Sequence, residues 1–274
     1  MTDVMSTRRL IAEELQVSAT FDAAEEIERR VVFLADRLVD TGLTTLVLGI
    51  SGGVDSTTAG RLCQLAAERA RAAGHPAVFV AMRLPYGVQA DEHHAQAALE
   101  FIRPDRLLTV DVKPAADAAL DALVAGGLTF RDAAQQDFVL GNVKARQRMI
   151  AQYAVAGAAG GLVVGTDHAA EAVTGFFTKH GDGAADLVPL TGLTKRRVRA
   201  LAAALGAPAE LVGKAPTADL ESLAPGKLDE DALGLAYEHI DDYLEGRPVP
   251  AEVEAALVER YRATEHKRRL PIAP

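Results

Sequence analysis

The chain has 274 residues, of which 49% are hydrophobic and 24% charged, a composition typical of a globular protein with a sizeable core. Its formal net charge of −9 argues against a general nucleic-acid-binding role, because such proteins present basic surfaces. A single cysteine excludes a disulfide framework. No apolar stretch reaches the roughly 20 residues that a membrane span needs, and the N-terminus has no signal-peptide core. We therefore expect a cytoplasmic protein.

Helical periodicity and capping signals predict two helices at the start, 6–15 and 22–40, the second with Asp22 as N-cap and Glu25 three residues later. Short apolar runs rich in branched residues then alternate with helical patterns, and such runs are typical of strands covered on both faces. The predicted strands are 44–50, 77–83, 106–112 and 162–166. The predicted helices among and after them are 56–73, 91–101, 114–125, 132–159, 194–205, 229–244 and 250–266.

Strands that alternate with helices indicate βαβ units with right-handed crossovers. The fold class that we predict is therefore α/β, with a doubly wound and mostly parallel sheet flanked by helices. We expect one domain over 1–274, with N-terminal helices at 1–43 and C-terminal helices at 229–268 packed on it. Two segments, 84–89 and 213–228, have an irregular pattern, and the second is expected to lie over a bound ligand.

The stretch LGISGGVDST, residues 48–57, lies between the first predicted strand and a helix. Ligands of doubly wound sheets bind at the carboxyl ends of strands, so we expect this turn to face a ligand. Gly52 and Gly53 let the backbone approach a phosphate, and the N–H groups and dipole of the helix start favour an anion. Asp55 beside an anion requires a cation between them, which suggests Mg²⁺. The spacing matches neither the Walker loop nor the G-x-G-x-x-G fingerprint.

SGGVDS resembles the pyrophosphatase loop of the ATP pyrophosphatase superfamily, whose members cleave ATP between the α- and β-phosphates and adenylate a substrate oxygen. Further segments resemble one family within it, the ammonia-dependent NAD synthetases, and they follow that family's order over nearly the whole chain. These segments are RLPYGVQADE (83–92), GNVKARQRM (141–149), VVGTDHAAEAVTGFFTKHGDGAADLVPL (163–190), KAPTADLE (214–221), IDDYLEG (240–246) and TEHKRR (264–269). One departure is Val54, which stands where glutamine is expected in this family. The resemblance implies a Rossmann-like fold of the adenine nucleotide alpha hydrolase type.

The resemblance also implies a reaction in two steps. The nicotinate carboxylate of deamido-NAD attacks the α-phosphorus of ATP, giving an acyl-adenylate and pyrophosphate. Ammonia then displaces AMP and leaves NAD, in the last step of NAD biosynthesis. Mg²⁺, ATP as co-substrate and a homodimer with shared active sites are implied as well. The chain lacks room for a glutaminase domain and Cys63 has no plausible triad around it, so free ammonia is the expected donor unless a separate subunit supplies it.

Site residues are implied by matching the chain to this family's motifs. The implied ATP-binding residues are Gly49, Ile50, Ser51, Gly52, Gly53, Val54, Asp55, Ser56, Thr166, Lys195 and Thr217. Asp55 and Glu171 match two Mg²⁺ ligands. The implied deamido-NAD contacts are Phe138, Asn142, Arg146, Phe176, Lys179, Asp186, His266 and Lys267. We expect Asp55, Lys195 and Asp182 to be catalytic, with Asp182 holding ammonium and assisting its deprotonation.

Two other functions stay open at this point, another adenylating ligase of the superfamily and a nucleotide-binding module without catalysis. The acidic charge and the lack of a cysteine pair argue against tRNA thiolation, and the two candidate Mg²⁺ carboxylates argue against a mere binder. Lys-Arg-Arg at 195–197 also fits a solvated helix face. The histidines suggest solvated or capping side chains and no metal site; they are His93, His94, His168, His180 and His239.

Overall fold

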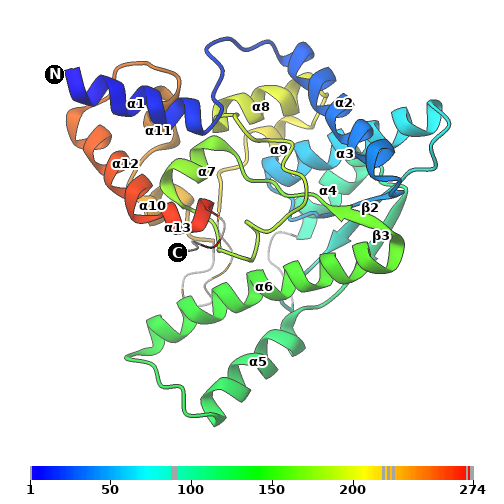
Figure 1. The fold of residues 1–274 in the computed structure, drawn as a ribbon. Helices are drawn as coiled ribbons and strands as arrows, with labels where there is room; N and C mark the ends of the chain where they lie inside the picture. The colour runs from blue at the N-terminus through cyan, green and yellow to red at the C-terminus, as the bar shows by residue number, and fades with distance from the viewer. Residues whose placement is uncertain are drawn as a thin grey trace.

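A single parallel sheet runs through the part of the chain that the computed structural model describes, which is residues 2–87, 92–217, 220, 223, 226–269 and 271. Its strands lie in the order β3–β2–β1–β4 (Figure 1). They are β1 (Thr45–Gly49), β2 (Val78–Arg83), β3 (Arg106–Thr109) and β4 (Gly161–Val163). β1 pairs with β2 on one side and with β4 on the other, so the strand order reverses at β1. This reversal is the point at which doubly wound sheets bind ligands.

Helices cover both faces of the sheet, and alternate residues of β1 face the two layers. Leu46 and Leu48 are buried in a cluster with the helices of one face, while Val47 is buried in a cluster with Ala156 of the other. The first face carries α2 (Ala23–Thr41), α3 (Val54–Ala72), α4 (Glu92–Ile102) and α8 (Lys195–Ala204). The second face carries α6 (Ala133–Ala159), and α5 (Lys113–Ala125) packs on α6. The predicted α/β class with a doubly wound parallel sheet is confirmed.

The two ends of the chain meet in a third apolar cluster beside the sheet (Figure 1). Ile11 packs there with Val173 and with Tyr243, whose ring is fully buried. The helices involved are α1 (Thr2–Glu14), α7 (Ala169–Thr174), α10 (Asp229–Leu233), α11 (Tyr237–Leu244) and α12 (Ala251–Ala263), followed by α13 (Glu265–Arg268). No helix among the described residues combines the length and apolarity that crossing a membrane requires.

Local signals account for most of the observed boundaries. Asp22 accepts hydrogen bonds from the backbone N–H groups of Ala24 and Glu25, so the predicted N-cap of α2 is confirmed. Cys63 is buried on α3, as expected of a small apolar side chain. The predicted helix over 229–244 is wrong, because Gly234 takes a left-handed φ of 61° and separates α10 from α11.

Other differences are confined to the ends of elements. The predicted 250–266 helix stops at Ala263, and a separate turn, α13, follows it. The predicted strands at 106–112 and 162–166 end at Thr109 and Val163. A short helix, α9 (Ala209–Val212), was not predicted. Of the two irregular segments, residues 88, 89, 218, 219, 221, 222, 224 and 225 lie outside the described residues.

Candidate active site

A cavity of about 460 Å³ lies at the carboxyl ends of β1 and β4, where the strand order reverses. Most of the predicted site residues line it. They are Gly49, Ile50, Ser51, Gly53, Val54, Asp55, Ser56, Phe138, Asn142, Thr166, Glu171, Phe176, Asp182, Lys195, Thr217 and Lys267. Gly52, Arg146, Lys179, Asp186 and His266 are not among the lining residues.

The loop after β1 is held in shape by its own hydroxyl groups. Ser56 Oγ accepts from Ser51 N at 3.2 Å and donates to Gly53 O at 3.2 Å, and Thr57 Oγ1 donates to Gly53 O at 2.8 Å. Gly53 is the N-cap of α3 and carries no side chain to bond the first N–H groups of the helix. Those N–H groups therefore face the cavity as an anion-binding site.

Gly52 packs against the neighbouring helix α4. Its φ of 86° is left-handed, and a Cβ there would lie 2.6 Å from Ala95 N of α4. Glycine at this position therefore lets the loop pack against α4, and the residue does not line the cavity.

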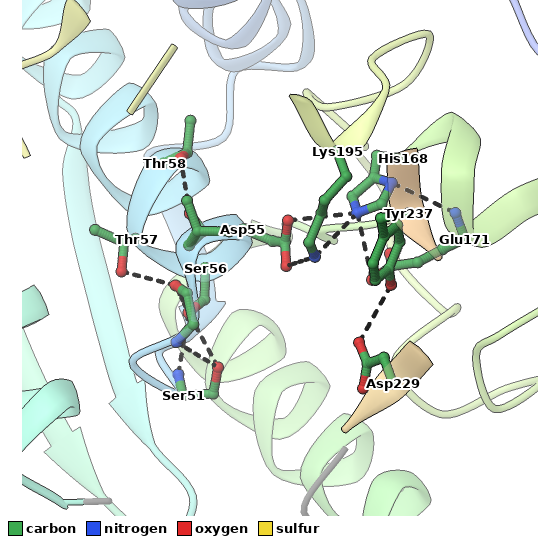
Figure 2. A network of polar contacts seen from close by, with 12 residues as sticks. Ser51, Asp55, Ser56, Thr57, Thr58, His168, Glu171, Lys195, Asp229 and Tyr237 are labelled. Carbon is green, nitrogen blue, oxygen red and sulfur yellow. Dashed lines mark hydrogen bonds and ion pairs between the residues drawn. The ribbon is translucent and has the colours of Figure 1, made fainter. Parts of the chain in front are cut away.

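Four charged or titratable side chains meet at one end of the cavity (Figure 2). Lys195 Nζ, at the start of α8, lies 2.7 Å from Asp55 Oδ2 in the first turn of α3. His168 Nε2 lies 3.4 Å from Asp55 Oδ1 and 3.4 Å from Glu171 Oε1. Lys195 is only 1% exposed, so the solvated helix face considered for 195–197 is wrong for this residue.

His168 is buried and acts as the N-cap of α7, so a capping role is right for this histidine. Its Nδ1 accepts from Glu171 N at 3.4 Å, which leaves the proton of a neutral ring on Nε2. Nε2 lies 3.4 Å from an oxygen of each carboxylate, Asp55 and Glu171, and 3.4 Å from Lys195 Nζ. His168 therefore contacts both acids and the lysine, a position that its sequence pattern had not indicated.

Burial and the neighbouring charges set the protonation of this cluster. Burial alone would raise the pKa of Asp55, but Lys195 and His168 hold that pKa well below its usual range. Burial raises the pKa of Glu171 to about 8, against the opposing effect of His168 and Lys195. Lys195 keeps its charge, because Asp55 and Glu171 raise its pKa in spite of burial. The ligand-free cluster thus holds one carboxylate, one ammonium and a second acid able to ionise.

The residues present fit a divalent cation. Ligand atoms of Asp55, His168 and Glu171 all lie within 4.8 Å of one another. Asp55 Oδ1 is buried and accepts no hydrogen bond from the described residues. Carboxylate oxygens beside a phosphate site suit Mg²⁺ better than an imidazole nitrogen does, so Asp55 and Glu171 rather than His168 are the candidate ligands.

The position of Lys195 is set from α11. Asp241 accepts hydrogen bonds from Lys195 N at 2.9 Å and Arg196 N at 2.7 Å, and Thr194 Oγ1 donates to Glu245 Oε1 at 2.7 Å. The IDDYLEG segment therefore caps the N-terminus of α8 from outside the helix.

The opposite wall of the cavity is apolar with a few polar groups. Phe176 and Phe138 line it, and Asn142 Oδ1 accepts from Thr178 Oγ1 at 3.0 Å. Asp182 Oδ1 accepts from Thr178 N at 2.9 Å. Asp182 lines the cavity and is exposed to solvent there, while desolvation by the protein around it raises its pKa. Lys267 Nζ donates to Gly175 O and Phe177 O at 2.9 Å and 2.8 Å, so its ammonium is fixed at the rim.

The predicted residues that do not line the cavity have visible reasons. Arg146 is exposed and donates to Lys179 O at 3.3 Å and 3.2 Å. Asp186 accepts from Val163 N at 2.7 Å and so holds the end of β4. His266 lies exposed on α13. These four side chains are outside the site that one chain forms.

Sequence reasoning missed several side chains around the site. Asp167 is beside the acid cluster, where burial and Asp182 raise its pKa to about 8. Tyr237 lies with its ring 5.0 Å from Lys195 Nζ and donates to Asp229 Oδ2 at 3.2 Å. Gln152 of α6 accepts from Gly49 N at 2.8 Å. A sequence signal was available for two of them, because Asp167 lies within the TDHAAE segment and Gln152 is a polar residue among the small and apolar residues of α6.

The parallel sheet has a glycine–serine loop at its switch point, and a lysine and two carboxylates lie beside that loop. This combination defines an ATP-utilising α/β enzyme. The comparisons then place it: the model of the NAD synthase family matches residues 26–271, and the chain belongs to that family. It is 74% identical over 270 residues to the NH(3)-dependent NAD(+) synthetase of Streptomyces coelicolor, covering 98% of both chains. It is 65% identical to the NH(3)-dependent NAD(+) synthetase of Burkholderia mallei over 98% of this chain and 95% of that one.

Solved structures agree with this placement. The fold matches the NAD+ synthetase from Burkholderia pseudomallei with a TM-score of 0.86 and 63% identity, over 98% of both chains. It also matches an NMN synthetase from Francisella tularensis with a TM-score of 0.81 and 32% identity, over 93% of this chain and 99% of that one. The predicted resemblance to the NAD synthetases is confirmed.

Proposed function

We propose that this chain catalyses the ATP-dependent amidation of deamido-NAD with ammonia, giving NAD, AMP and pyrophosphate. The observation that carries the proposal is the meeting of Lys195, Asp55 and Glu171 beside the open N-terminus of α3. That end of the cavity suits the phosphates of ATP. The other end, with Phe176 and Asp182, suits an aromatic acid and the incoming nitrogen.

In the first step, the chain has to bind the triphosphate and neutralise the charge that develops on it. The N–H groups at the start of α3 and the hydroxyls of Ser51, Thr166 and Thr217 face the cavity and can donate to phosphate oxygens. Asp55 and Glu171 would hold Mg²⁺, which neutralises phosphate charge and polarises the phosphorus when bound. Lys195 supplies a second cation for the departing pyrophosphate.

In the second step, ammonia attacks the acyl carbon and AMP leaves. The reactive species is NH₃, so ammonium must lose a proton inside the site. Asp182 lines the cavity and accepts a hydrogen bond from Thr178 N, and desolvation by the surrounding protein raises its pKa, which suits a group that takes up this proton. Phe176 and Phe138 provide flat apolar surfaces for the nicotinate ring.

We also propose that the active form is a homodimer. Arg146, Lys179 and His266 lie outside the cavity of one chain, and basic side chains suit the diphosphate of a dinucleotide. Phe138 and Ile150 of α6 are 59% and 51% exposed, which leaves apolar surface beside them for a second copy. A single domain over 1–274 and a cytoplasmic location stay part of the proposal.

The test is NAD formation by the purified chain with ATP, Mg²⁺ and an acid substrate, comparing ammonium with glutamine. We expect product with ammonium alone and with deamido-NAD as the preferred acid. Because one structural relative is an NMN synthetase, nicotinate mononucleotide is the second acid to test. Higher kcat/KM with the mononucleotide would contradict the proposed substrate. ATP binding without turnover on either acid would favour another ligase or a non-catalytic binder.

A further inference from the structure

The turn of residues 178–183, which carries the proposed proton acceptor of the second step, packs against α6. Arg146 of α6 donates to Lys179 O at 3.3 Å and 3.2 Å. A Cβ on Gly181 would lie 3.0 Å from the Cβ of Ala145, the residue before Arg146 on the same helix. Glycine at 181 therefore lets the turn lie directly on the helix surface.

Thr178, the first residue of this turn, links α6 to Asp182. Its hydroxyl donates to Asn142 Oδ1 at 3.0 Å, and its backbone N–H donates to Asp182 Oδ1 at 2.9 Å. Thr178 lines the cavity but is only 4% exposed. Both hydrogen bonds therefore start at a residue that is screened from bulk water, where such bonds are stronger than at an exposed position.

A further hydrogen bond fixes the amide of Asn142. Asn142 Nδ2 donates at 3.0 Å to Phe138 O, one turn earlier on α6. The amide oxygen is then turned toward Thr178 Oγ1, so the hydroxyl is the donor of the bond between the two side chains. Asn142 is thus held at both ends of its amide, and it anchors the side chain of Thr178 to the helix.

The contact with Thr178 acts on the charge of Asp182 as well as on its orientation. Asp182 is exposed toward the cavity, and Thr178 N–H holds one of its two oxygens. The same N–H group favours the ionised carboxylate, so it opposes the rise in the pKa of Asp182 that desolvation causes. The ionised carboxylate is the form that can take a proton from ammonium.

We propose that Thr178 and Asn142 are positioning residues for the second step of the reaction. Asn142 anchors the hydroxyl of Thr178 to α6, and the N–H of Thr178 then holds the carboxylate of Asp182 at the point where ammonium arrives. The proposal rests on the proposed function, because it assigns a role within the same reaction. Formation of the acyl-adenylate does not use this contact.

The step that the contact serves begins with a proton transfer. Ammonium gives one proton to the Asp182 carboxylate and becomes NH₃. The nitrogen lone pair forms a bond to the acyl carbon, while the bond from that carbon to the AMP oxygen breaks and its electron pair stays on AMP. The nitrogen releases a second proton to solvent, and the carboxamide of NAD is left. A displaced Asp182 slows the first transfer and leaves acyl-adenylate formation unchanged.

The first experiment compares Thr178→Val with Thr178→Ser. Valine keeps the branched shape of threonine but has no hydroxyl, whereas serine keeps the hydroxyl and lacks the methyl group. For Thr178→Val we expect kcat/KM for ammonium to fall about five- to tenfold, the effect of losing one hydrogen bond. For Thr178→Ser we expect a value close to that of the native chain.

A second readout separates positioning of Asp182 from a general loss of structure. The exchange of labelled pyrophosphate into ATP, measured with deamido-NAD and without ammonium, reports the first step alone. We expect the native exchange rate in Thr178→Val, because the hydroxyl of Thr178 bonds to Asn142 on the wall opposite the phosphate site.

Thr45→Val is the matched control. Thr45 is also 4% exposed, and its hydroxyl also donates a hydrogen bond, to Ala159 O at 3.1 Å. It lies at the start of β1, whereas the cavity lies at the carboxyl ends of the strands. We expect native kcat/KM for ammonium and a native exchange rate in Thr45→Val.

Thr178→Ala keeps the test valid if Thr178→Val does not fold. Serine and alanine at position 178 differ by one oxygen atom, so the ratio of their kcat/KM values for ammonium isolates the hydroxyl. We expect Thr178→Ser to exceed Thr178→Ala about five- to tenfold.

A double variant tests the role of Asn142. If Asn142 acts through Thr178, adding Thr178→Val to Asn142→Leu causes no further loss of kcat/KM for ammonium, because the bond between the two side chains is already gone. Losses that multiply in the double variant would show independent roles and would reject the link from Asn142 through Thr178 to Asp182.

Native kcat/KM for ammonium in Thr178→Val, or equal values for Thr178→Ser and Thr178→Ala, would overturn the proposal. A loss of pyrophosphate exchange as large as the loss in ammonium use would also overturn it, because Thr178 would then support the whole site. If the native chain forms no NAD with ammonium, the proposed function has failed and the positioning role fails with it. A native chain that forms NAD and is matched by Thr178→Val would reject the positioning role alone.

Discussion

Lys195 Nζ lies 2.7 Å from Asp55 Oδ2, although the two residues are 140 positions apart in the chain. The contact joins the first turn of α3 to the first turn of α8, beside the strand where the sheet order reverses. Lys195 is nearly completely buried, and the side chain of Asp55 is 18% exposed. A buried ammonium and a partly buried carboxylate thus stabilise each other in the same place where a nucleotide would need both a cation and a metal ligand.

Removing the ammonium should affect catalysis more than substrate binding. For Lys195→Met we expect kcat to fall by about 10²–10³-fold, because the cation acts on charge that develops during phosphoryl transfer. Steady-state kinetics with saturating ammonium measures this. Lys195→Arg is the companion variant; the larger planar guanidinium does not fit the same buried contact, so it should not restore activity. A kcat within threefold of native for Lys195→Met would contradict the assignment.

The two candidate metal carboxylates should govern the Mg²⁺ requirement. For Asp55→Asn and Glu171→Gln we expect the Mg²⁺ concentration for half-maximal activity to rise at least about tenfold, because one anionic ligand is lost. A Mg²⁺ titration at fixed ATP measures it. Glu68→Gln, an exposed position on the same helix as Asp55, is the control. Unchanged titration curves for both site variants would place the metal elsewhere.

Replacing the adjacent loop glycines Gly52 and Gly53 by alanine should affect different properties, stability in the first case and ATP binding in the second. Gly52→Ala combines a left-handed φ of 86° with a contact of 2.6 Å to Ala95 N, so we expect the free energy of unfolding to drop by about 3 kcal/mol. Gly53→Ala has an ordinary φ of −78° and meets only Ser51 Oγ at 3.5 Å. It should keep native stability but bind ATP more weakly, because the methyl group enters the cavity. Urea unfolding and calorimetry separate the two effects, and equal stability losses would reject this account.

Asp241 should make stability depend on pH. Burial raises its pKa to about 6, while the backbone N–H groups of Lys195 and Arg196 oppose that shift. The folded chain holds this proton more tightly than the unfolded chain, so the contribution of Asp241 to stability is present below the unfolded pKa and declines as pH rises through 6. Relative to Asp241→Asn, the native chain should lose about 1.4 kcal/mol between about pH 5 and about pH 7.5. Urea unfolding of both chains at the two pH values measures this, and a pH-independent difference would contradict it.

Local patterns in the sequence were enough to predict most of the strands and helices of the fold. Branched apolar runs predicted all four strands, and Asp22 and Asp132 begin α2 and α6 as side-chain caps. Gly234 was misjudged because the helical periodicity continues through it, and a lone glycine inside a helical pattern does not reveal that it takes a left-handed conformation. Strand ends were also overextended, because apolar residues after Thr109 and Val163 continue the pattern without continuing the ladder.

The residues of the candidate site also fall into those that the sequence could predict and those that it could not. The loop residues after β1 could be predicted because the chemistry lies in one continuous stretch. His168 and Asp241 could not, because the first acts on Asp55 from a distant segment and the second caps a helix to which it does not belong. Arg146, Lys179 and His266 were predicted by resemblance alone, and one chain does not bring them to its cavity. Contacts between distant segments, or between copies, leave no periodic signal in a single sequence.

The most direct test of the account follows one oxygen atom. Deamido-NAD labelled with ¹⁸O in its carboxylate is converted with ATP and ammonium, and the AMP product is examined by mass spectrometry. If the carboxylate attacks the α-phosphorus and ammonia then breaks the acyl bond, one labelled oxygen is found in each AMP. Unlabelled AMP, or ADP with labelled phosphate, would show that no acyl-adenylate forms and would contradict the central claim.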